Sequence, residues 1–155
     1  MTTSNEGIAL IKQFEGCRLT AYKDSVGVPT IGYGHTRGVR MGQTITQVEA
    51  LRLLREDLLP VERTLNALNV NMPQRTYDAL ASWIYNLGTG NFSQSTLKRQ
   101  IIARASDHDI AAQIIRWTRA GGKVLKGLQL RRIAEANHML GSEYYQLING
   151  VITHK

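Results

Sequence analysis

The feature that most limits the fold of this chain is a glycine-rich run between two helical patterns. Among residues of the Thr, Tyr, Val and Ile types, glycine recurs at positions 27, 32, 34, 38 and 42. Such a segment predicts short strands and tight turns rather than a helix. Residues 24–27 (DSVG) are a turn signal, and Pro29 biases Val28 toward an extended backbone. We therefore expect a small β ribbon over residues 18–42.

A helical pattern precedes the ribbon. Thr3 and Glu6 have the spacing of a capping box, and an apolar stripe at helical spacing follows them. Gly16 suits the end of this helix. The pattern predicts a helix over about residues 3–15.

A longer helical pattern follows the ribbon. Thr46 and Glu49 form a second capping box, and an apolar stripe runs from Val48 to Leu68. Pro60 lies inside this stripe, so we expect a kink or a split there.

The rest of the chain also reads as helical. Pro73 suits a helix start and Gly88 a helix end. Further helices are expected at 94–104, 108–117, 127–140 (ended by Gly141) and 142–148. The order of helix, small ribbon and many helices predicts an α+β chain with segregated elements, not an alternating βαβ chain.

Composition sets the class of protein. The chain has 155 residues, of which 43% are apolar and 20% are charged, which fits one compact domain over residues 1–155. No apolar run reaches the length of about 18 residues that a membrane span needs, so we expect no stable membrane insertion. Cys17 is the single cysteine, which excludes an intrachain disulfide and a cysteine-based zinc site. We expect its thiol to be buried and inert.

The charge balance indicates an acidic partner. Basic residues outnumber acidic ones by 19 to 12, a net charge of +7 with neutral histidines. The partner could be nucleic acid, an anionic membrane surface or an anionic polymer such as a bacterial cell wall. A basic helical module with Arg131 and Arg132 on nucleic-acid phosphates is one alternative. However, the basic residues are scattered among acids, and no recognition motif for nucleic acid is present.

Motifs of cofactor and metal chemistry are missing. Residues 32–38 resemble a dinucleotide fingerprint, but they are one residue too long and no βαβ unit surrounds them. Gly122-Lys123 lacks the upstream glycine of a phosphate loop. The four histidines show no pair at metal-ligand spacing. We expect neither a cofactor nor a metal.

One segment carries two carboxylates and a hydroxyl. Glu15 closes the first helical pattern, Asp24 follows nine residues later, and Thr30 lies six residues further on. A glycosidase needs one protonated and one ionised carboxyl group. Apolar Phe14 and the negative end of the helix dipole disfavour the charged form of Glu15, which suits a general acid. Asp24 in its polar turn and Thr30 could hold a water molecule. The same residues also fit a solvated helix end and an ordinary turn.

Five ordered blocks of sequence surround these residues, namely 14–16 (FEG), 19–24 (LTAYKD), 27–36 (GVPTIGYGHT), 86–92 (NLGTGNF) and 117–123 (WTRAGGK). Together they resemble the signature of phage-type lysozymes (endolysins), glycoside hydrolase family 24. The resemblance runs from about residue 5 to residue 140. Two positions depart from the family, because Arg119 stands where relatives often have an aromatic residue and Lys126 where they often have proline.

The resemblance implies hydrolysis of the β-1,4 bond between N-acetylmuramic acid and N-acetylglucosamine in peptidoglycan. The family pattern is Glu, eight residues, Asp, five residues, Thr, which Glu15, Asp24 and Thr30 match. It implies Glu15 as the general acid. Asp24 and Thr30 would place and activate water on the opposite face of the sugar, with inversion. Inverting enzymes hold their two carboxyl groups roughly 6.5–9.5 Å apart.

The resemblance also implies the architecture. The family has a lysozyme-like, mostly helical α+β fold with a cleft between two lobes. In this chain the small β-ribbon lobe would cover about residues 16–45. The helical lobe would cover about residues 70–155, with the N-terminal helix packed on it. We expect a monomer.

Weaker cleft predictions concern substrate binding. Gly32 would let the ribbon backbone approach a saccharide closely, and His35 is expected to brace the site rather than react. Tyr85 and Asn86 resemble sugar contacts, although core packing is an open alternative for Tyr85. Arg131 or its neighbour could pair with Glu15, or could belong to a solvated helix face.

The N-terminus shows no secretory signal, because it has neither a basic region nor an apolar core of the right length. We expect synthesis in the host cytoplasm and release through a separate membrane-permeabilising protein of the holin type. The enzyme would then act in the periplasm or cell wall. An inactive relative that only binds wall glycan is a further alternative, which the intact triad of Glu15, Asp24 and Thr30 disfavours.

Overall fold

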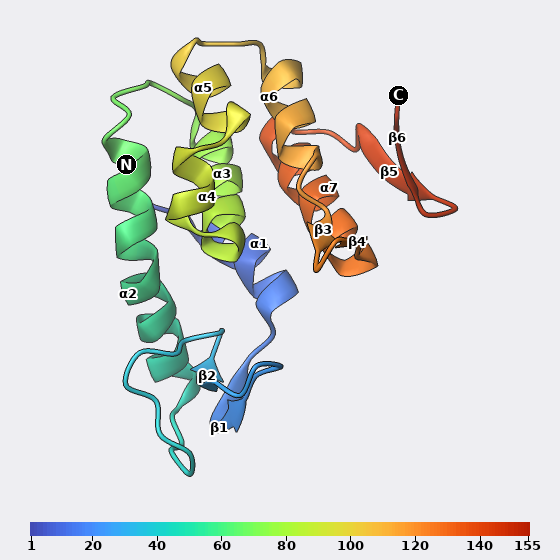
Figure 1. The fold of residues 1–155 in the computed structure, drawn as a ribbon. Coiled ribbons are helices and arrows are strands. Elements are labelled where there is room, and N and C mark those ends of the chain that lie inside the picture. Colours follow the sequence, from blue (N-terminus) through green and yellow to red (C-terminus); the bar gives the residue numbers. More distant parts are fainter. The chain divides into compact units, whose positions relative to one another are not determined.

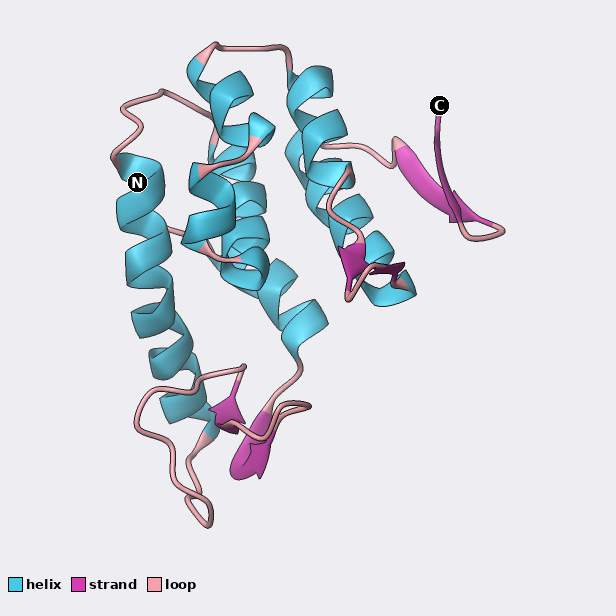
Figure 2. Cartoon of the chain, in the orientation of Figure 1, coloured by secondary structure: helices cyan, strands magenta, loops and turns pink.

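The computed structural model describes all 155 residues (Figure 1). The helices are α1 Asn5–Glu15, α2 Gln47–Asn66, α3 Gln74–Leu87, α4 Thr89–Ser93, α5 Thr96–Ile102, α6 Asp107–Ile115 and α7 Lys126–Leu140. The strands are β1 Arg18–Lys23, β2 Pro29–Gly32, β3 Arg119–Ala120, β4 Lys123–Val124, β5 Tyr145–Ile148 and β6 Val151–His154. They form three antiparallel pairs, and helices dominate the rest of the chain (Figure 2). The predicted α+β class with segregated elements is confirmed.

Residues 11–60 form one compact unit, and residues 1–10 with 61–155 form another. In the smaller unit, β1 pairs with β2 in the predicted ribbon. A third extended segment lies beside β1, because the N–H of Ala21 donates to the carbonyl of Gln43 and the N–H of Ile45 to the carbonyl of Leu19. The ribbon is therefore wider than its two named strands.

Helix α2 begins with the predicted capping box. The hydroxyl of Thr46 accepts from the N–H of Glu49, and the carboxylate of Glu49 accepts from the N–H of Thr46, both at 3.2 Å. The helix then runs unbroken through Pro60, so the predicted split is wrong. Leu58 and Val61 on either side of the proline are buried, and their packing outweighs the lost backbone hydrogen bond.

The first residues of the larger unit are bound by side chains far along the chain. The N–H and the hydroxyl of Thr3 both donate to Glu62 Oε2 at 2.8 Å. Ser4 donates to Asp78 through its hydroxyl and through its N–H, and its hydroxyl accepts from the N–H of Gly7. Ser4 is therefore the N-terminal cap of α1. The predicted capping box of Thr3 and Glu6 is wrong, because Glu62 takes the hydroxyl of Thr3.

Gly7 of α1 has a structural reason to be glycine. A Cβ at this position would lie 2.6 Å from Cγ of Asp78 and 2.7 Å from Cγ2 of Thr3. The backbone of α1 therefore passes too close to the Asp78 carboxylate for any side chain.

The core of the larger unit lies where α3 and α6 pack on α7. Its fully buried large side chains include Tyr77, Trp83, Phe92, Leu97 and Ile114. Burying a side chain of this size stabilises the fold by about 1.5–3 kcal/mol. None of the helices combines the length and apolar character needed to cross a bilayer.

The helix ends of this unit match most of the predictions. Pro73 precedes α3 and Gly88 follows it, and Gly141 ends α7 in the left-handed conformation. Helices α5, α6 and α7 lie at the predicted places, whereas the short α4 was not predicted.

The C-terminus is a β-hairpin, so the predicted helix over 142–148 is wrong. β5 pairs with β6 through a two-residue turn at Asn149-Gly150, with φ of 51° and 77°. Positive φ at both central residues is the type I′ geometry that Asn-Gly favours. The hairpin is tied to α7, because Gln129 donates to the carbonyl of Gly150 and Asn137 exchanges two hydrogen bonds with the backbone of Tyr145.

Candidate active site

Glu15 is the last residue of α1. Gly16 ends the helix with a φ of +65°, and the chain enters β1 two residues later. The side chain of Glu15 is half-buried. The carboxyl group of Glu15 therefore lies between the end of α1 and the start of β1, as the sequence predicted.

Asp24 follows β1 directly, and its carboxylate is held by its own turn. Oδ1 accepts from the N–H of Val26 at 3.0 Å and from the N–H of Val28 at 2.8 Å. The N–H of Asp24 in turn donates to the carbonyl of Val28 at 3.0 Å. Oδ2 accepts no hydrogen bond from the protein. One carboxylate oxygen thus fixes the turn, while the other can bind a ligand.

Thr30 lies on β2, opposite Tyr22 of β1, and only 4% of its surface is exposed. Its hydroxyl donates to the carbonyl of Val28 at 2.9 Å. The backbone of Val28 therefore binds both Asp24 and Thr30. Tyr22 and Thr30 are cross-strand partners and share a face, and Asp24 lies two residues after Tyr22. Because side chains alternate along a strand, this register puts Asp24 and Thr30 on the same side of the hairpin.

Gly32 and His35 form the next turn of this unit. The backbones of Ile31 and His35 exchange two hydrogen bonds of 2.9 Å. Gly32 has a φ of +65°, and a Cβ there would meet Ala50 only at 3.5 Å. The left-handed backbone, rather than lack of space, therefore requires glycine.

The ring of His35 is held at both nitrogens. Nδ1 lies 2.8 Å from Asp57 Oδ2 on α2, and Nε2 lies 2.9 Å from the carbonyl oxygen of Arg37. His35 is buried. Since both ring nitrogens have partners, this side chain ties the turn to α2, an arrangement suited to bracing. Sequence reasoning missed Asp57, which lies 22 residues from His35 in an ordinary helical pattern.

Cys17 is exposed, so the prediction of a buried thiol is wrong. It follows the helix-ending Gly16, where the chain runs along the surface. Gln47 Nε2 donates to Cys17 Sγ at 3.8 Å and also to the hydroxyl of Tyr33. Burial raises the pKa of Tyr33, and the neighbouring Cys17 raises it further.

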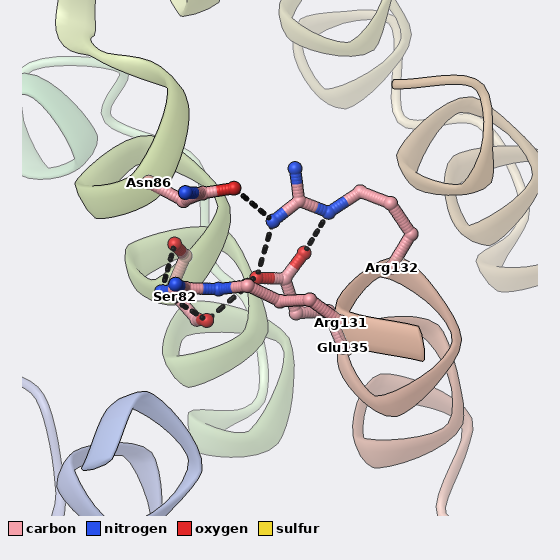
Figure 3. A network of polar contacts seen from close by, with 5 residues as sticks. All are labelled: Ser82, Asn86, Arg131, Arg132 and Glu135. Carbon is pink, nitrogen blue, oxygen red and sulfur yellow. Dashed lines mark hydrogen bonds and ion pairs between the residues drawn. The ribbon is translucent and has the colours of Figure 1, made fainter. Parts of the chain in front are cut away.

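Asn86 and Arg131 lie in the larger unit, in a buried polar network between α3 and α7 (Figure 3). The network is centred on Glu135, which is fully buried. Arg132 Nε lies 2.7 Å from Glu135 Oε1, and Arg131 Nε lies 3.3 Å from Oε2. The hydroxyl of Ser82 donates to Oε2 at 2.6 Å. Burial raises the pKa of Glu135, and the charges of Arg132 and Arg131 oppose that rise.

The network fixes the amide of Asn86. Arg132 Nη2 donates to Asn86 Oδ1 at 2.9 Å and to Glu135 Oε2 at 3.0 Å (Figure 3). The oxygen of the amide therefore faces Arg132, which leaves Nδ2 as the group that can donate elsewhere. Tyr85, the preceding residue of α3, is half-buried.

Sequence reasoning did not find the centre of this network. Arg131, Arg132 and Glu135 have the i, i+3 and i, i+4 spacings of helical ion pairs, which was the available signal. The sequence does not reveal that the pairs are buried, because Ser82 and Asn86 come from another helix.

No group of three His, Cys, Asp or Glu side chains lies together in an arrangement that could hold a metal ion. The chemistry available at the ribbon is that of carboxyl and hydroxyl groups. Such groups can transfer protons and position water without a cofactor.

Comparisons with known proteins match most of the chain. The family model described as phage lysozyme matches residues 12–135. A relative named SAR-endolysin, from Bacteriophage PS119, is 46% identical over 127 residues, which are 78% of this chain and 73% of that protein. A solved P22 lysozyme mutant has a TM-score of 0.81 and 41% identity over 90% of this chain and 99% of that one. The muramidase domain of SpmX from Asticcacaulis excentricus has a TM-score of 0.83 and 36% identity over 90% of this chain and 97% of that domain.

Proposed function

Because the chain belongs to the phage lysozyme family and is thus a muramidase that degrades peptidoglycan, we propose that Glu15, Asp24 and Thr30 carry its chemistry. The bond cleaved is the β-1,4 bond between N-acetylmuramic acid and N-acetylglucosamine. The reaction needs a proton for the leaving oxygen and a nucleophile for the sugar carbon.

Glu15 supplies the proton in this proposal. As the C–O bond breaks, the carboxyl proton moves to the leaving oxygen of the glycosidic bond. Its position as the last residue of α1, just before the ribbon of β1 and β2, supports this role.

Asp24 and Thr30 hold the attacking water. Water adds to the anomeric carbon from the opposite face and gives its proton to Asp24, so the sugar carbon is inverted. The observation that carries the proposal is the shared backbone of Val28, which binds Asp24 through its N–H and Thr30 through its carbonyl. This link supports a shared role in placing water, because the Asp24 carboxylate and the Thr30 hydroxyl are bound to the same backbone residue.

The remaining predicted contacts have supporting roles. His35 braces the turn through Asp57, and Gly32 supplies the left-handed backbone of that turn. Asn86 donates from its Nδ2 to a sugar oxygen, because Arg132 binds its Oδ1. Tyr85 precedes Asn86 on α3, and Arg131 supports the network through its hydrogen bond to Ser82.

The experiment digests purified peptidoglycan and identifies the new reducing end. Muramic acid at that end is the expected result, whereas an anhydro sugar would indicate a transglycosylase and glucosamine a glucosaminidase. Inversion of a β bond predicts the α anomer as the first product, which NMR of early time points detects.

A matched pair of variants tests Glu15. Glu15→Gln should lower the rate of wall digestion by about 10²–10⁴-fold without changing the melting temperature by more than a few degrees. Glu6→Gln alters an exposed glutamate of the same helix and should leave the rate unchanged. Equal rates for the two variants would remove Glu15 from the mechanism.

The enzyme acts on the bacterial cell wall, and we propose that a separate protein of the holin type releases it there. Expression in a bacterial host should cause lysis only together with such a protein. Lysis on expression of the enzyme alone would contradict this route.

A further inference from the structure

The turn between α6 and α7 carries a cluster of cations. Residues 116–126, which we call the basic hairpin, include β3 and β4 and contain Arg116, Arg119, Lys123 and Lys126. No Asp or Glu occurs between Asp109 and Glu135. All four cationic side chains are exposed, and none forms an ion pair.

The basic hairpin is anchored at its base. The ring of Trp117 packs edge-to-face on the buried ring of Trp83, with centroids 5.2 Å apart. The N–H of Leu125 donates to the carbonyl of Thr118 at 3.0 Å. Every residue from 119 to 127 is exposed, so the ribbon beyond this anchor is presented to solvent.

Both faces of the ribbon carry a charge. Arg119 pairs with Val124, and Ala120 pairs with Lys123. Since cross-strand partners share a face and neighbours alternate, Arg119 and Lys123 point to opposite faces. The tip is Gly121-Gly122, with φ of 58° and 77°, and has no side chain to insert into a bilayer.

We propose that the basic hairpin binds the carboxylates of the peptide branches of peptidoglycan. A branched polymer can reach both faces of a narrow ribbon, whereas a flat anionic membrane can contact only one face of a ribbon whose tip lacks an apolar anchor. Long-range attraction to the carboxylates concentrates the enzyme on the wall. The choice of peptidoglycan as the partner rests on the proposed function. Binding to it does not require catalysis.

The test measures binding to intact sacculi by the Glu15→Gln protein, so that the wall is not digested. Lys123→Gln with Lys126→Gln should weaken binding to native sacculi by roughly threefold to tenfold and should reduce its dependence on salt. Sacculi with amidated carboxyl groups should bind weakly, with little difference between the two proteins.

A matched control removes the same charge elsewhere. Lys98→Gln with Lys155→Gln lowers the net charge equally and should change binding by less than about twofold. An equal loss in this control would overturn the proposal in favour of diffuse attraction. Undiminished binding to amidated sacculi, or hairpin-dependent binding to phosphatidylglycerol vesicles, would also overturn it. The reducing-end assay on the protein with Glu15 intact reports separately on the proposed function.

Discussion

The β1–β2 hairpin and the α3–α7 network position polar groups by opposite means. In the hairpin, Asp24 is held by N–H groups two and four residues away. In the network, Glu135 is held partly by Ser82, 53 residues away, inside a region closed to water. A local turn can tolerate the loss of one bond, whereas a buried charge depends on every partner that compensates it. The loss of unfolding free energy should therefore decrease from charged long-range contacts to neutral local ones.

The largest effect is expected for the charged long-range contact. Glu135→Gln leaves two buried guanidinium groups without their shared carboxylate and should lower the unfolding free energy by about 3–5 kcal/mol. Thermal and urea unfolding of the variant and the original protein measure this loss. Glu56→Gln is the matched control, because Glu56 pairs with Arg52 at the same i, i+4 spacing on the surface. That variant should lose less than about 1 kcal/mol. Similar losses would remove burial as the cause.

The charged local contact comes second. Asp24→Ala removes the acceptor of two backbone N–H groups and should cost about 1–2 kcal/mol. Asp24→Asn keeps an amide oxygen for those bonds and should retain most of the stability. Both variants should lose wall-digesting activity, because neither can take a proton from water. An Asn variant with normal activity would show that the turn, and not the charge, is what matters.

The same difference between local and long-range contacts limits what the sequence can predict. The Asp24 turn and the Thr46 capping box join residues within a few positions, so their spacing identified both. Contacts of Asp57 with His35 and of Glu62 with Thr3 cross 22 and 59 residues, and no local pattern reports them. The same competition explains the failed capping box at Thr3, since a distant carboxylate took its hydroxyl.

The C-terminal hairpin was missed for another reason. Asn149-Gly150 is a strong local turn signal, but the segment before it is too short for its periodicity to distinguish a strand from a helix. Exposure of Cys17 likewise depends on the path of the chain after α1, which composition does not reveal.

A neutral long-range contact ranks third. The hydroxyl of Tyr77 donates to the carbonyl of Met1 at 3.0 Å, so Tyr77→Phe should cost about 1 kcal/mol near neutral pH. Burial, with help from Glu62, raises the pKa of Tyr77 to about 12. A raised pKa favours the protonated form in the fold, so this stabilisation is complete below about pH 10 and is lost as the pH rises through about 12.

Melting temperatures of both proteins across alkaline pH test this assignment. The loss between pH 10 and 12 should be smaller in the Tyr77→Phe variant, by the equivalent of about 1–2 kcal/mol. Parallel curves for the two proteins would place the alkaline transition on another group.

The smallest effect is expected for the neutral local contact. Thr46→Ala removes one bond of the capping box of α2 and should cost about 0.5–1 kcal/mol. Thr46→Ser keeps the hydroxyl and should recover most of that loss, as denaturant unfolding would measure. A loss above that of Asp24→Ala would reverse the ranking of local contacts.

The hydrogen bonds between Ser4 and Asp78 have a consequence for synthesis on the ribosome. Ser4 needs Asp78, which is translated 74 residues later. At about 5–20 residues per second, Ser4 waits roughly 4–15 seconds for the synthesis of this partner. Residues 1–10 therefore stay open to chaperones and proteases until α3 has left the exit tunnel, so the larger unit cannot close in the order in which it is made.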